Sequence, residues 1–248
     1  MLAWLEFITR LLNRWFAAPT DALLSLLHIQ PDHPSHPIGN TLTLELLVFA
    51  GLVLFFIIVR ASLSVEKPGS AQHVAELVHQ FVSGQADQVM GHGNEPFLPI
   101  LTCFLLFILI CNLLGLLPGI DTPTANPVVP LALAVCAFIY YNWNGLRVQG
   151  PVHYVKHFMG PVGWLSPLLF PIEIVSHLSR IMSLTIRLYA NMFASDLITL
   201  IFFSGIPLVI PMVGLGLHLF VAVIQAYVFM LLNMIYLAQA TAHNESSL

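Results

Sequence analysis

The chain has 248 residues, of which 58% are hydrophobic and only 8% are charged, whereas a typical soluble domain has about 25% charged residues. With a mean hydropathy of +0.86, this composition excludes an ordinary soluble fold and predicts an all-α, polytopic membrane protein with about five passes of roughly 20 residues each. The net charge of −4 is spread along the chain, and no basic tract indicates nucleic-acid binding.

The first 40 residues are expected to form a separate external segment ahead of a membrane domain over residues 41–248. Apolar residues with helical spacing predict an amphipathic helix on the membrane surface: Trp4, Leu5, Ile8, Leu11, Leu12 and Trp15. Charged residues interrupt this stretch, so we expect no cleaved signal peptide. Three histidines follow in a Pro-rich stretch, which favours a solvated loop over a metal site: His28, His33 and His36.

Three apolar spans come next, at about residues 44–59, 97–117 and 128–143. The polar segment at 64–96 keeps helical spacing at Val74, Leu77, Val78 and Phe81, which predicts a short surface helix. Two longer apolar tracts follow at about 165–203 and 207–239, joined by a turn at 204–207. Since each exceeds one perpendicular crossing, we expect two long, tilted helices.

Basic residues predict the orientation. Arg60 and Lys67 follow the first span, and Arg147 and Lys156 follow the third, so both segments are expected in the cytoplasm. The N-terminus is then outside and the C-terminus inside. Arg10 and Arg14 favour the opposite orientation.

The first long tract carries a polar stripe. At 100° per residue, six polar or small residues fall within about 40° of Arg187. They are Glu173, Ser176, Arg180, Ser183, Asn191 and Ala194. A helix with such a stripe must face water, protein or another polar surface rather than lipid.

Two interpretations of these charges stay open. Arg180 neutralises Glu173 in an ion-paired packing face, or the stripe is functional. Arg187 is harder to explain by packing, because the acids on its stripe lie two or more turns away and arginine keeps its charge. We therefore expect its anionic partner to come from another chain.

The last tract has a matching pattern. His218 and Gln225 share a face, which Tyr236 and Gln239 continue. The histidine is either a hydrogen-bonded core residue or a proton relay. The predicted turn brings it back to the depth of Asp196, where an acid and an imidazole would form an outer proton route, with Glu173 toward the cytoplasmic end.

Three motifs carry a family resemblance: SLTIRLYANMFA (183–194), FILICNLLGLLPG (107–119) and QAYVFMLLNMIYL (225–237). Over roughly residues 40–243 the chain resembles subunit a of the bacterial F-type ATP synthase membrane (Fo) sector. The resemblance implies a non-catalytic stator subunit of the cell inner membrane that moves protons through two offset half-channels and so drives ATP synthesis. Implied partners are a ring of c subunits, peripheral-stalk b subunits and lipid, with no cofactor or metal.

By the same resemblance, Arg187 is the essential arginine that faces a c-subunit carboxylate. The outer route contains Asn191, Asp196, His218 and Gln225, and Glu173 belongs to the inner route. The sequence departs from the family at Asp196, where many members have Glu, at Arg180, and at the Tyr189-Ala190 pair, where Phe-Gly is common.

A secondary transporter with an intramembrane ion site is the main alternative, although we find no internal repeat and no helix break in the polar stripe. A zinc protease would need HExxH, which is absent. Ser183 and His177 differ by about 120° on the helix, so they do not form a serine-protease pair. A purely structural anchor leaves Arg187 unexplained.

Overall fold

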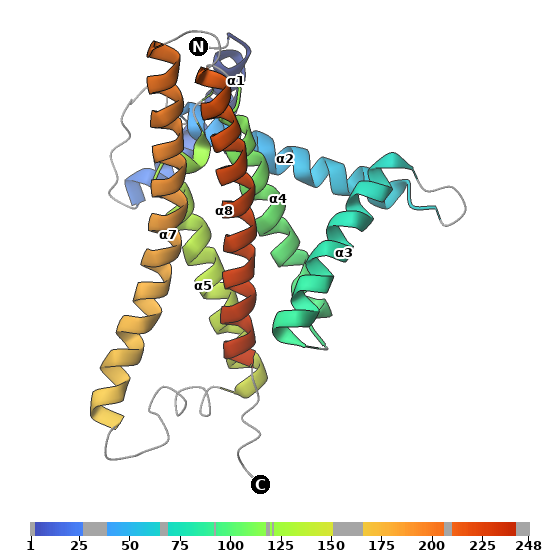
Figure 1. Ribbon diagram of the computed structural model, residues 1–248, viewed down its shortest axis with the longest axis vertical. Coiled ribbons are helices and arrows are strands. Elements are labelled where there is room, and N and C mark those ends of the chain that lie inside the picture. Colours follow the sequence, from blue (N-terminus) through green and yellow to red (C-terminus); the bar gives the residue numbers. More distant parts are fainter. Residues whose placement is uncertain are drawn as a thin grey trace.

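The computed structural model describes residues 3–26, 39–64, 69–91, 93–117, 120, 122–150, 166–205 and 210–241. Every regular element in these ranges is helical (Figure 1). The α-helices are α1 (Ala3–Leu26), α2 (Asn40–Ala61), α3 (Ser70–Met90), α4 (Leu98–Leu114), α5 (Val128–Gln149), α7 (Ser166–Gly205) and α8 (Ile210–Thr241). Two short 3₁₀ helices, η1 (Glu95–Phe97) and η2 (Pro123–Ala125), flank α4.

Five of these helices are long and apolar enough to cross a membrane: α2, α4 together with η1, α5, α7 and α8. This confirms the predicted all-α polytopic fold and the predicted number of passes. A helix is also present within 64–96, as expected: it is α3, and its 21 residues make it longer than the short helix predicted. Its place on the membrane surface stays a prediction. The turn at 204–207 lies partly outside the described residues, because α7 ends at Gly205 and α8 begins at Ile210.

The lengths of the helices fix how they sit in a bilayer. The 22 residues of α2 span about 33 Å, close to the roughly 30 Å of the hydrocarbon core. The 40 residues of α7 span about 60 Å, so this helix fits only if it is steeply tilted. In Figure 1, α2 indeed runs across the direction of α7 and α8. The tilt lets one helix carry groups at several membrane depths.

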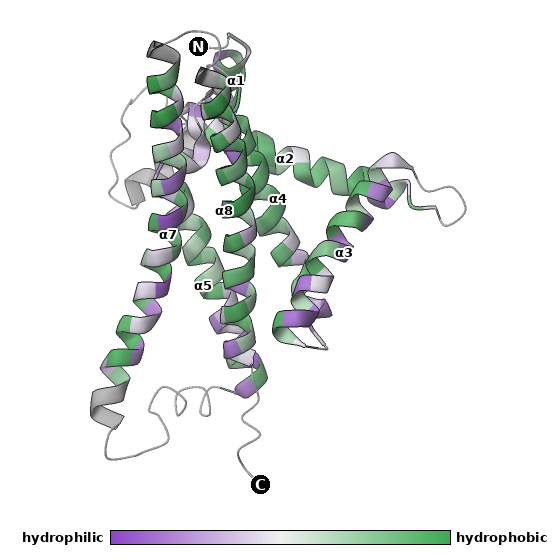
Figure 2. Ribbon diagram, in the orientation of Figure 1, coloured by the Kyte–Doolittle hydropathy of each residue, from purple (hydrophilic) through white to green (hydrophobic). Residues whose placement is uncertain are grey.

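Helix α8 is the centre of the packing, since it contacts α3, α4, α5 and α7. The core between these helices contains large side chains with less than 2% exposure, among them Leu101, Ile108, Leu188, Met192, Met230 and Met234. By contrast, α2 is mostly exposed apolar surface, and Figure 2 shows it almost wholly hydrophobic while α7 is marked by polar residues along its middle. The apolar core therefore holds the polar segment of α7 in place.

The N-terminal helix was expected to be amphipathic, and α1 does expose Trp4, Phe7 and Leu11. Its buried side is more polar than predicted, because the Thr9 hydroxyl lies 3.0 Å from the Thr43 hydroxyl of α2. That contact attaches α1 to the bundle. Its position on a membrane surface and the division at residue 40 stay predictions, and His28, His33 and His36 lie outside the described residues.

Asn112 ties three elements together. It is fully buried in α4, its amide nitrogen donates to the Ala222 carbonyl of α8 at 3.2 Å, and its amide oxygen accepts from the Thr124 hydroxyl of η2 at 2.6 Å. Burying these polar atoms without partners would be costly, so the network fixes how α4, η2 and α8 meet.

Replacing Asn112 with Leu should destabilise the protein by about 1–3 kcal/mol, because the Thr124 hydroxyl and the Ala222 carbonyl lose a partner. Thermal unfolding of the purified chain in detergent would show this as a lower midpoint. Asn144→Leu is the matched control, since the Asn144 side chain bonds Tyr140 of its own helix and joins no other element through these bonds. Equal midpoints for the two variants would contradict the assignment.

Candidate functional site

The polar stripe of α7 lies at the border between its buried and exposed faces. Leu184, Leu188 and Met192 are buried against the bundle, about 100° around the helix from Arg187. Ile186 and Leu197 are exposed at about 100° on the other side. Along the stripe, Glu173, Ser176, Arg180 and Arg187 are partly exposed, and Ser183, Asn191 and Ala194 are exposed. The chain therefore presents a polar edge at its surface.

Among the described residues, the Arg187 guanidinium donates one hydrogen bond, to the Ser183 hydroxyl at 3.4 Å. Across the described ranges, no carboxylate lies within 4.0 Å of it. A hydroxyl does not neutralise a permanent cation. Most donors of this partly exposed guanidinium therefore have no partner among the described residues.

Asp196 and His218 form an ion pair that joins α7 to α8, with Asp196 Oδ1 3.2 Å from His218 Nδ1. The Thr122 hydroxyl donates to the same carboxyl oxygen at 3.0 Å. The other ring nitrogen, His218 Nε2, lies 3.0 Å from the Asn112 backbone carbonyl. The expected meeting of an acid and an imidazole at one depth is therefore present in the structure.

The hydrogen bonds of this pair constrain its protons. A backbone carbonyl only accepts, so Nε2 of His218 carries a hydrogen. The Nδ1–Oδ1 contact then needs one more proton, which sits either on the imidazole or on the carboxyl group. The geometry thus leaves room for one proton shared between Nδ1 and Oδ1.

A cavity of about 610 Å³ reaches this pair from the surface, and Thr41, Thr122, Asn126, Asp196 and Thr199 contribute polar atoms to its lining. The Asp196 side chain is 31% exposed, whereas that of His218 is 1% exposed. The lining is mostly apolar, but a cavity of this size with several polar groups in its wall is large enough to hold water. The carboxyl group thus lies between the cavity and the buried imidazole.

The remaining predicted residues, Gln225, Tyr236 and Gln239, all lie on α8. Gln225 is buried in α8, two turns from His218, and Gln239 is exposed near the end of that helix. Tyr236 lies under the Arg180 guanidinium, whose central carbon is 5.0 Å from the ring centroid. Among the described residues, Arg180 makes no ion pair with Glu173, which instead pairs with His177 at 3.4 Å. The ion-paired packing face considered for these two charges is therefore not formed.

Several residues of the site were not predicted. Thr122 and Asn112 contact the Asp196–His218 pair. His177 pairs with Glu173, and Tyr141 bonds His177. Asn112 lies within one of the motifs that carry the family resemblance, but the spacing of residues in the sequence does not indicate that it bonds His218. Thr122 sits in a connection without periodicity, so only the folded chain reveals it.

Gly115 is required by a close approach of the pair to α4. A Cβ atom at this position would collide with the Thr122 hydroxyl and would lie 2.9 Å from the His218 ring. Gly115 has ordinary helical backbone angles, so the requirement is for space and not for conformation.

Gly115→Ala should therefore displace Thr122 or His218 and lower both stability and any proton movement through the pair. Gly216→Ala, in α8, is the matched control, because nothing lies within 4 Å of the added Cβ there. Thermal unfolding and proton pumping of the assembled complex would be measured for both. A Gly115→Ala protein that behaves like the control would show that Thr122 and His218 do not need the space at Gly115.

Comparison with known proteins assigns the family. The sequence model of the "ATP synthase A chain" family matches residues 42–238. ATP synthase subunit a of Koribacter versatilis is 53% identical over 96% of this chain and 97% of its own length. The subunit a of Solibacter usitatus is 43% identical over 93% and 98%, and subunit a 2 of Syntrophotalea carbinolica is 43% identical over 70% and 74%. The chain belongs to the ATP synthase subunit a family, the polytopic membrane subunit of that complex.

Proposed function

We propose that this chain is the proton-translocating stator subunit of a bacterial F-type ATP synthase, and that it couples proton flow to rotation of a c-subunit ring. The observation that carries the proposal is the placement of Arg187. It is a permanent cation on an exposed polar edge of a membrane helix, with only a serine hydroxyl bonded to it in the described part of the chain. Family membership supports the same function.

The cost of the charge favours a partner chain. An arginine at the centre of a membrane costs at least about 2.5–3.5 kcal/mol, and such residues pair with other groups or line water. A carboxylate on a rotating c subunit would offset that cost as it passes Arg187. Peripheral-stalk b subunits would hold the chain still against the ring, and ATP chemistry would take place on other subunits of the complex.

The outer route is proposed to use the 610 Å³ cavity. A proton from the outside would enter there, reach the Asp196–His218 pair and pass along Gln225 and Asn191 to the c-subunit carboxylate. The single mobile proton of the pair supports this path, because accepting a proton at one atom allows release from the other. The neutral carboxyl group would then rotate into lipid at low cost.

The inner route is proposed to end at Glu173, on the same stripe as Arg187 but about four turns away. A carboxyl group that returns from lipid would release its proton there, because water and charged groups favour its ionised form. Arg187, between the two routes, would attract the ionised carboxylate and repel a proton that attempts direct passage. Ser176, Arg180 and Ser183 would keep this edge polar.

The proposed location is the cell inner membrane, with the N-terminus outside and the C-terminus in the cytoplasm. Arg60 and Arg147 at the ends of α2 and α5 support this orientation through the positive-inside rule.

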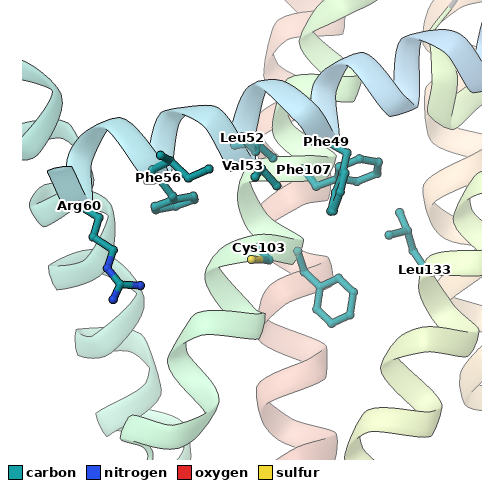
Figure 3. A pocket seen from close by; sticks show the side chains of 10 residues that line it. Phe49, Leu52, Val53, Phe56, Arg60, Cys103, Phe107 and Leu133 are labelled. Carbon is teal, nitrogen blue, oxygen red and sulfur yellow. The ribbon is translucent and has the colours of Figure 1, made fainter. Parts of the chain in front are cut away.

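A secondary transporter is less well supported. Besides the cavity at Asp196, the chain has a groove of about 510 Å³ beside α2 (Figure 3). Its lining is almost wholly apolar, with Phe49, Phe56 and Phe107 prominent and Arg60 at one end. A substrate site needs several convergent polar groups, which this groove lacks.

Arg187→Ala should abolish ATP-driven acidification of inverted vesicles while the complex still assembles, and passive proton leak should rise because nothing separates the two routes. Pumping and leak would be measured by a pH-sensitive dye, with complex content checked on a native gel. Arg147→Ala is the control, since that guanidinium stacks on Trp143 of its own helix at 5.3 Å. Normal pumping by Arg187→Ala would overturn the proposed function.

Orientation can be tested separately. A peptide tag added after residue 248 should be removed by protease added to inverted vesicles, because their outer surface is the cytoplasmic face, and should resist protease in intact spheroplasts. The reverse pattern would show that the C-terminus is outside and that the two proton routes exchange sides.

A further inference from the structure

A second histidine–carboxylate pair lies in the half of α7 toward Glu173. His177 Nε2 is 3.4 Å from Glu173 Oε1, and its other ring nitrogen, Nδ1, is 3.1 Å from the Tyr141 hydroxyl of α5. The side chain of His177 is only 13% exposed, that of Glu173 is 36% exposed, and Tyr141 is buried. The carboxyl group therefore covers a largely buried imidazole that rests on a phenol.

We propose, on the basis of the function above, that His177 is a second proton-exchanging group of the inner route, and that Tyr141 positions it for exchange with Glu173. The pair would take up one proton from the ring side and release one to the inner water. No other bond is made or broken, and the proton count balances.

Tyr141 is suited to this role because a hydroxyl both donates and accepts. When the pair is fully deprotonated, the phenol donates to Nδ1 of His177 and Nε2 donates to Glu173. When the pair carries a proton, Nδ1 donates to the phenol oxygen, and the proton between Nε2 and the carboxyl oxygen sits on either atom. Each ring nitrogen keeps its partner in every state, which avoids the cost of an unsatisfied buried group.

Aromatic packing holds the imidazole in this position. The His177 ring stacks on Tyr141 with an interplanar angle of 25° and meets the edge of Phe138 at 6.0 Å. Tyr141 in turn packs against Tyr236 of α8. An imidazole packed against two rings of α5, one of them supported by α8, has few rotamers left, so its nitrogens stay aimed at the two oxygens.

The same packing keeps the neighbouring cation away from the pair. Arg180, one turn beyond His177, lies over the Tyr236 ring rather than against Glu173. The charged and titratable groups around His177 include Glu173 and Arg180 of α7, Tyr141 of α5 and Tyr236 of α8. A carboxylate already paired with a guanidinium would hold its charge firmly, whereas one paired with an imidazole can share a proton.

His177→Gln tests the proposal, because glutamine can bond both oxygens but cannot take up a proton. In inverted vesicles the inner route opens to the medium, and ATP-driven pumping draws protons from it. We expect pumping by the variant, divided by uncoupled ATP hydrolysis in the same vesicles, to fall several-fold near neutral pH. Its decline with rising medium pH should begin at least about one pH unit lower, since a glutamate alone ionises at more acidic pH than an imidazole.

The control is His73→Gln in α3. His73 also lies beside a glutamate, 4.0 Å from Glu76, but both side chains are well exposed and outside the polar stripe. It should keep the native profile. Tyr141→Phe should move the profile of the native chain in the same direction as His177→Gln while the amount of complex stays normal.

A native pH profile in His177→Gln, or a uniform loss without a shift, would mean that His177 only packs, and the inference would be wrong. The proposed function would survive that result, because it depends on Arg187→Ala. Changing the pH inside the vesicles, at the outer route, should affect His177→Gln and native vesicles equally.

Discussion

An arginine cannot give up its charge inside a membrane, and the arrangement of this chain depends on that constraint. Arg187 has to be held where an anion can reach it and where lipid cannot surround it. The helix that carries it therefore needs a buried side to anchor it and a polar edge to present it. Leu184, Leu188 and Met192 form the anchor against α8, and the stripe through Ser183 and Asn191 forms the edge.

The tilt of α7 and α8 follows from the same need. A helix of about 20 residues would be too short to carry both Glu173 and Asp196. The 40 residues of α7 place these two acids at well-separated positions along one continuous helix. At each place, an acid is paired with a histidine: Asp196 with His218, and Glu173 with His177. Arg187 lies between them without an acid of its own in the described residues.

The two pairs differ in how their histidines are supported. His218 bonds a backbone carbonyl, which fixes a hydrogen on one nitrogen, and sits almost fully buried behind a carboxyl group that faces a cavity. His177 bonds a phenol, which adapts to either protonation state, and it is held by aromatic rings. In the first pair, the absence of a side chain at Gly115 leaves room for the His218 ring. In the second pair, the contact of Arg180 with Tyr236 keeps the guanidinium from pairing with Glu173.

Much of this was predictable from sequence where periodicity carries the information. Composition and apolar spans gave the five passes, and the angular positions of Glu173, Arg180 and Arg187 gave the stripe. Contacts between distant segments were not predictable. Thr122 reaches Asp196 across 74 residues, and Tyr141 reaches His177 across 36, and neither spacing reflects a helical repeat. Arg180 and Glu173 share a helix face but do not pair with each other. Arg180 contacts Tyr236 of α8, and His177, the partner of Glu173, packs against Tyr141 of α5. The spacing within one helix does not predict these contacts.

The central claim is that Arg187 is paired by a carboxylate of another chain. The most direct measurement is an electron cryo-microscopy structure of the assembled complex in lipid, read at the Arg187 guanidinium. The account predicts a carboxylate of a rotor subunit as the nearest acid to it, reached directly or through one water, with α7 retaining its contacts to α8. A guanidinium paired with an acid of its own chain, or surrounded by lipid with no rotor carboxylate passing at its depth, would contradict it.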